Sequence, residues 1–156
     1  MDTNFIAELH PKIVHFPVAL LSIYAVLEIT GIAIKKDFIS RCALLLLSLG
    51  VVAAFLAVLS GNQAFTEFQS WTEESKELVT RHQNYATFLS WFSFFACALR
   101  LYLTIKNKFV GVKKVLFIFF SVVILYLIYE TAEHGGKLVS KFGVGTEIIM
   151  QEKSKP

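Results

Sequence analysis

The chain has 156 residues, of which 55% are hydrophobic and only 17% are charged. An average soluble domain has about 45–50% apolar and about 25% charged residues. This composition excludes a disordered, collagen-like or nucleic-acid-binding chain, and a soluble domain of this size would expose large apolar patches. The net charge of +3 points to no particular partner. The composition therefore indicates a protein that is solvated by membrane lipid.

Four apolar runs have the length of about 20 residues that a membrane helix needs. They cover 13–34, 42–60, 84–105 and 115–133. Because short connections join the first run to the second and the third to the fourth, we expect an all-α, integral membrane, antiparallel four-helix bundle.

We expect one membrane domain over residues 1–146, followed by a flexible tail at 147–156. The longer polar connection over 61–83 contains Phe68 and Trp71, which predict a helix lying at the membrane interface.

The charges near the span ends predict the orientation. The first and third connections, with the adjoining span ends, carry eight basic residues and one acid, Asp37. The middle connection has two basic residues, Lys76 and Arg81, and four glutamates. Because cytoplasmic connections carry the excess of Lys and Arg, we expect both termini and the middle connection on the non-cytoplasmic side.

The four histidines all map to that same side. His10 and His15 stand at the start of the first run, His82 just before the third, and His134 at the end of the fourth. Successive spans alternate in direction, so these imidazoles converge on one end of the bundle. Five residues at 100° each place His10 and His15 about 140° apart on a helix, so they need not bind the same ion.

Haem b is one ligand that fits this pattern, because its iron takes two neutral imidazoles from facing helices. As iron ligands we rank His15, His82, His134 and His10 in falling order, for one or two haem groups. The many Phe side chains of the third and fourth runs suit a flat apolar ligand.

Other residues at the same level would complete such a site. Gly61, Gly135 and Gly136 would make room for the porphyrin, or the last two would only end a helix. Arg81 and Lys137 would face the propionates.

Two other interpretations stay open. Copper or zinc would use the same histidines, with Glu130 or Glu133 as an extra ligand or as an acceptor that orients an imidazole. In the other interpretation there is no cofactor, and the histidines only form hydrogen bonds at the interface of a structural subunit of a respiratory-type complex.

Two charged residues lie inside the apolar runs. Glu28 could be part of a proton relay, but we favour snorkelling toward the interface or pairing with Arg100. Arg100 itself is most simply an interfacial anchor.

The segments LHPKIVHFPVALL and HGGKLVSKFGVG, with Ser60-Gly61 and His82, resemble a bacterial family of small predicted four-helix membrane proteins of unknown function. The resemblance covers roughly residues 8–146. It implies a haem-b-type or redox-associated module of the bacterial inner membrane, since some relatives are joined to cytochrome c-like domains. At the motif positions it carries over His10, His15, His82 and His134.

We therefore expect a redox carrier or subunit rather than a stand-alone enzyme. Its partners would be a cytochrome c-type protein or a quinol, within a larger complex or a homo-oligomer, with lipid around it and no nucleic acid.

Overall fold

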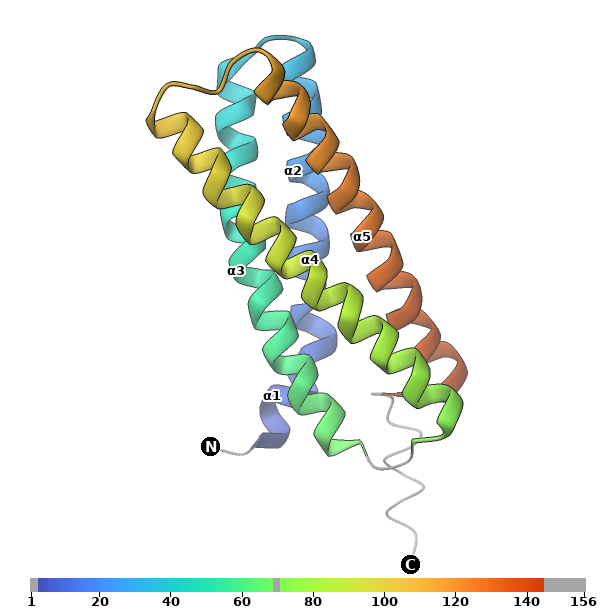
Figure 1. Ribbon diagram of the computed structural model, residues 1–156. Coiled ribbons are helices and arrows are strands. Elements are labelled where there is room, and N and C mark those ends of the chain that lie inside the picture. Colours follow the sequence, from blue (N-terminus) through green and yellow to red (C-terminus); the bar gives the residue numbers. More distant parts are fainter. Residues whose placement is uncertain (1–2, 69–70, 145–156) are drawn as a thin grey trace, which may run out of the picture.

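The computed structural model describes residues 3–68 and 71–144, and in this part of the chain every regular element is a helix. The helices are α1 (Thr3–Ile13), α2 (His15–Ala33), α3 (Asp37–Glu67), α4 (Glu73–Ile105) and α5 (Val112–Phe142) (Figure 1). The predicted tail at 147–156 lies outside the described residues. The predicted all-α fold is confirmed.

Four of the described segments are long and apolar enough to cross a membrane, as predicted. They are Ala7–Ala33, Asp37–Thr66, Glu73–Ile105 and Val112–Phe142. Helices α2, α3, α4 and α5 form a ring in which each packs against its two neighbours, and α1 lies against α3 (Figure 1). The start of α1, the end of α3, the start of α4 and the end of α5 share one end of the bundle. We call it the histidine end.

The first span is broken into α1 and α2 at Val14. Pro17 has no N–H to donate to the carbonyl of Ile13, and its ring clashes with that carbonyl. The main chain bridges the break with hydrogen bonds from Val14 N to His10 O (3.1 Å) and from Val18 N to Val14 O (3.5 Å). Val14 itself keeps helical dihedral angles, φ −61° and ψ −23°, so α1 and α2 together form the first span, with α1 packed against α3.

The middle connection differs from the prediction. In place of an interfacial helix over 61–83, α3 runs on to Glu67 and α4 begins at Glu73. The start of α4 is fixed by a capping box, in which Ser75 N donates to Thr72 Oγ1 (3.2 Å) and Thr72 N donates to Ser75 Oγ (2.9 Å). Polar side chains thus extend the spanning helices beyond their apolar stretches, and hydropathy alone does not register that extension.

Close packing of α2 on α3 depends on a small residue of α3, Gly50. A Cβ added at Gly50 would lie 2.6 Å from Leu21 Cδ2. Leu21, Tyr24, Leu47 and Ile124 are fully buried at the centre of the ring. Many large apolar side chains point outward instead, which suits contact with lipid.

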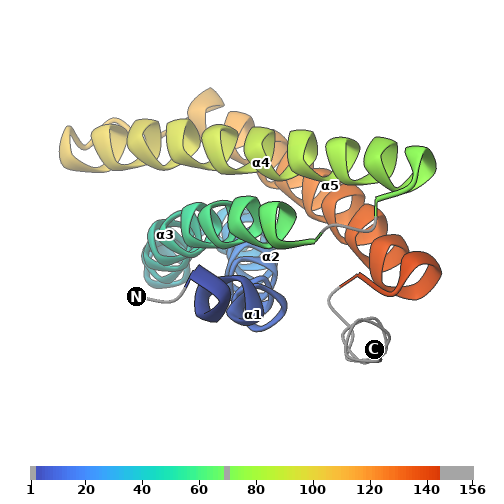
Figure 2. The same ribbon diagram turned by 90° about the horizontal axis from the view of Figure 1, so that it is seen from below.

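Viewed from the histidine end, the ribbons form two groups (Figure 2). Helices α1, α2 and α3 lie together, and α4 and α5 run side by side at a slant to them. Among the described residues α1 has no close backbone contact with α4 or α5. Any contact between α1 and the α4–α5 pair therefore depends on long side chains.

Candidate functional site

Three of the four histidines lie at the histidine end and interact with one another electrostatically, each from a different helix. His10 comes from α1, His82 from α4 and His134 from α5. His10 lies within electrostatic range of His82, and His82 within range of His134. His15 is the first residue of α2, and its side chain is exposed. The highest-ranked of the predicted iron ligands is therefore the one that stands apart from the other three.

His10 is held by α3. Its Nδ1 lies 3.0 Å from Ser60 Oγ, and Ser60 donates its own hydroxyl proton to Ala57 O at 3.0 Å. With the Ser60 proton on Ala57 O, Nδ1 of His10 donates to Ser60 Oγ. The neutral ring then carries its lone pair on Nε2.

His82 and His134 are held in the same way by main-chain oxygens of α5. His82 Nδ1 lies 2.9 Å from Thr131 O, and His134 Nδ1 lies 2.6 Å from Glu130 O. A carbonyl oxygen can only accept, so both Nδ1 atoms carry a proton. All three imidazoles therefore have Nδ1 within hydrogen-bond distance of a protein oxygen, and in each neutral ring the lone pair lies on Nε2.

Two glycines make this arrangement possible. A Cβ added at Gly61 would lie 2.9 Å from His10 Cε1, and one added at Gly135 would lie 3.0 Å from His82 Cε1. Gly136 has nothing within 4 Å of such an atom. Gly61 and Gly135 thus make room for imidazole rings. The alternative interpretation of Gly135 and Gly136 as a helix end is wrong, since α5 continues to Phe142 and ends at Gly143.

A buried polar atom near the histidines has no partner. The side-chain Oε1 of Gln63 forms no hydrogen bond with any described residue. Gln63 lies three residues after Ser60 on α3, so both face the same side of that helix. An unsatisfied buried acceptor costs about 1–3 kcal/mol, so a polar group not belonging to the described chain would relieve it.

The basic residues expected to face propionates form ion pairs on the surface. Arg81 pairs with Glu77 at 2.8 Å and Lys137 with Glu133 at 2.9 Å, each one turn apart on its own helix. These exposed pairs contribute little stability, so both cations could exchange partners readily. In the part of the chain that the structure describes, no three His, Cys, Asp or Glu side chains form a metal-binding group.

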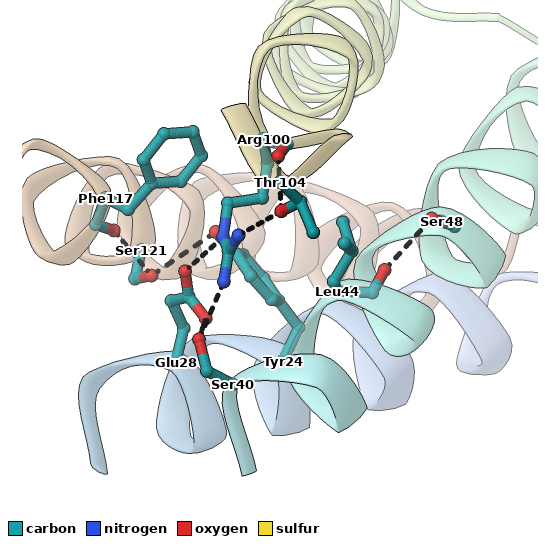
Figure 3. Close-up of polar contacts among 9 residues, drawn as sticks. All are labelled: Tyr24, Glu28, Ser40, Leu44, Ser48, Arg100, Thr104, Phe117 and Ser121. Carbon is teal, nitrogen blue, oxygen red and sulfur yellow. Dashed lines mark hydrogen bonds and ion pairs between the residues drawn. The ribbon is translucent and has the colours of Figure 1, made fainter. Parts of the chain in front are cut away.

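A second polar cluster lies toward the opposite end of the bundle, which we call the ion-pair end. Arg100 Nε donates to Glu28 Oε1 at 2.8 Å, and both side chains are almost fully buried, at 4% and 0% exposure. The NH2 group of Arg100 donates to Ser40 Oγ at 2.6 Å, and Ser40 donates to Glu28 Oε2 at 3.2 Å. Figure 3 shows Arg100 reaching from α4 toward Glu28 and Ser40. The predicted pairing is confirmed, whereas the interpretation of Arg100 as an interfacial anchor is wrong.

Two further contacts complete the ion-pair cluster, and sequence reasoning missed both. Arg100 NH1 donates to Thr104 Oγ1 at 2.5 Å. The ring of Phe109, in the connection between α4 and α5, covers the guanidinium carbon at 3.3 Å from the ring centroid. Each of the three guanidinium nitrogens thus donates one hydrogen bond within the protein, which suits a structural role rather than an open binding site.

The fold and the two clusters define an all-helical bundle with four potential membrane spans and a histidine-lined end. The family described as Predicted membrane protein (DUF2231) matches residues 7–148, nearly the whole chain. The chain therefore belongs to this family, which confirms the resemblance seen in the sequence. No curated protein and no solved structure matches the chain.

Proposed function

We propose that the protein transfers electrons in the bacterial inner membrane and binds haem b at the histidine end. His10 and His82 would hold the haem iron. The observation that carries the proposal is the common state of the imidazoles, each with Nδ1 bound to a protein oxygen and Nε2 left with its lone pair. This is how protein ligands to a metal are usually oriented.

His10 and His82 are the favoured pair for two reasons. They come from the two groups of helices at the histidine end, so a ligand between them would be held from both sides (Figure 2). Each ring also rests on a glycine, Gly61 or Gly135, so its position is set by backbone rather than by a movable side chain.

Haem fits this donor set better than a bare ion does. The porphyrin supplies four of the six iron ligands, so two imidazoles complete the coordination. The unpartnered Oε1 of Gln63 is a polar acceptor in the same region and could face a propionic acid or an ordered water. When bound, haem b would supply one-electron chemistry. The protein residues would hold it, orient the imidazoles and exclude water.

The partners would be those expected from the sequence. With its many basic residues, the ion-pair end would face the cytoplasm and the histidine end would face away from it. A haem there would be within reach of a cytochrome c-type protein in solution, or of a quinol in the membrane. We favour a carrier or a subunit of a larger complex over a stand-alone enzyme.

The test is an absorption spectrum of the purified detergent-solubilised protein, with iron, copper and zinc measured per chain. The proposal predicts about one iron per chain, a Soret band, and sharp α and β bands after reduction. About one copper or zinc per chain without porphyrin absorbance would show that the histidines bind a metal ion and not haem. A colourless, metal-free protein would leave the structural-subunit interpretation in its place.

A further inference from the structure

His134 lies outside the pair of proposed haem ligands, and it belongs to a separate cluster of α4 and α5. Its ring packs on that of Tyr85, with centroids 5.2 Å apart and planes 31° apart. Its Nδ1 lies 3.7 Å from Glu130 Oε2. The Tyr126 hydroxyl is within electrostatic range of both Glu130 and Tyr85. We call Tyr85, Tyr126, Glu130 and His134 the head cluster.

The head cluster faces the surroundings of the protein where α5 changes from apolar to charged. Tyr126 is 54% exposed, while Glu130 and His134 are partly exposed. One turn further along α5 stands the charged pair of Glu133 and Lys137. A carboxylate, an imidazole with a free Nε2 and two phenol hydroxyls thus lie at the border between the apolar zone and water.

An apolar groove of about 250 Å³ starts one turn from this cluster. It is lined by Phe88, Trp91, Phe92, Phe95, Ala96 and Leu99 of α4 and by Phe120 of α5. Tyr85 lies three residues before Phe88, so the head cluster and the groove share one face of α4. The groove runs along the helices in the apolar zone, and the small side chain of Ala96 leaves the hollow between the large rings.

We propose that the groove and the head cluster together bind an isoprenoid hydroquinone or its quinone. The prenyl chain would lie in the groove, and the ring would lie at Tyr85 and His134, with its hydroxyl groups bonded to Glu130 and to Nε2 of His134. The acyl chain of a phospholipid would also fit the groove. Its headgroup, however, has no planar ring with hydroxyl groups that could bond to Glu130 and His134 beside the ring of Tyr85.

This inference rests on the proposed function and names its electron donor. A hydroquinone that is oxidised to the quinone releases two electrons and two protons. The electrons would pass one at a time to ferric haem b, the oxidant in the proposed function, and the protons to water at the histidine end.

Binding can be measured without electron transfer, because a quinone quenches tryptophan fluorescence on contact. The chain has two tryptophans, so the Trp71→Phe variant leaves Trp91 in the groove as the sole reporter. With decyl-substituted benzoquinone as the probe, we expect saturable quenching in Trp71→Phe. The variant Trp91→Phe, with Trp71 as reporter, should show only weak, linear quenching.

Further variants, each made in the Trp71→Phe background, test the two halves of the site. Ala96→Leu fills the groove and should abolish saturable quenching, while Ala98→Leu makes the same change at an exposed position of α4 and should leave it intact. Glu130→Gln removes the charged acceptor and should weaken binding about tenfold.

Linear quenching that is the same in Trp71→Phe, Ala96→Leu and Trp91→Phe would overturn the proposal, because the probe would then only partition into the micelle. If quenching stayed saturable and unchanged in Glu130→Gln and Tyr85→Phe, the head cluster would not be the binding site of the quinone ring. The haem spectrum of each variant is recorded in parallel. If the purified protein showed saturable quenching but contained no haem, the quinone site would stand and the proposed haem-binding function would be wrong.

Discussion

Nε of Arg100 donates a hydrogen bond to Oε1 of Glu28 over 2.8 Å and joins α4 to α2 across the interior of the bundle. The α2 and α4 backbones are not in close contact, so this ion pair links the two helices through their side chains. With Ser40 of α3 hydrogen-bonded to both charges, the pair ties three spans together at the ion-pair end.

Removing one partner of this pair should destabilise the protein strongly. Arg100→Met leaves the Glu28 carboxylate buried and uncompensated, at a cost of about 3–5 kcal/mol. The double variant Glu28→Leu with Arg100→Met should recover most of that loss, since buried pairs can be replaced by apolar side chains. Thermal unfolding in detergent measures both.

The surface pair of Arg81 and Glu77 provides the matched control. Arg81→Met removes the same charge from an exposed pair of the same 2.8 Å length and should change stability by less than about 1 kcal/mol. Equal melting temperatures for Arg100→Met and Arg81→Met would show that the buried pair is not structural.

Gly135 should be far less tolerant than its neighbour. A Cβ at Gly135 would lie 3.0 Å from His82 Cε1, so Gly135→Ala should displace the imidazole from Thr131 and lower the haem content. Gly136→Ala meets nothing within 4 Å and should keep the haem while stabilising α5 by up to about 1 kcal/mol. Equal haem content in the two variants would mean that the His82 ring is not held by Gly135.

Packing of α2 on α3 should depend on Gly50. In Gly50→Ala the new methyl group would approach Leu21 Cδ2 to 2.6 Å, so the helices must separate or the leucine must move, at a cost of about 1–3 kcal/mol. Adding Leu21→Ala should make the combined loss smaller than the sum of the two single losses. Melting temperatures of the single and double variants test this, and strict additivity would contradict the contact.

The start of α4 should depend on its capping box. Thr72→Ala removes the acceptor for Ser75 N and should cost about 1 kcal/mol. Thr80→Ala is the control, because its hydroxyl is exposed and bonds only to Lys76 O within the helix. Hydrogen exchange of residues 73–81 is the direct measurement. Identical exchange in the two variants would mean that the cap does not fix this end.

The spans could be predicted from the sequence because apolar length reports membrane crossing directly. Their ends could not, because residues such as Glu77 and Arg81 extend α4 through local pairs that hydropathy averages away. The placement of His10, His82 and His134 at one end followed from the alternating direction of the spans, and in the structure all three lie at the histidine end.

The direction in which each side chain points was harder to predict. His15 was ranked first among the predicted iron ligands, yet it is exposed while His10 is held by Ser60. The helical angle between them already indicated different faces. Which face is inward, however, depends on the packing of α1 against α3. Likewise, the position of Arg100 near a span end gave no sign that Phe109 would fold over it.

The most direct test of the central claim compares the reduced-minus-oxidised absorption spectra of His82→Ala, His10→Ala and His15→Ala with that of the unaltered protein, at equal protein concentration. We predict that the α band is lost or strongly shifted in His82→Ala and His10→Ala and is unchanged in His15→Ala. A full-strength α band in His82→Ala, or its loss in His15→Ala alone, would contradict the account.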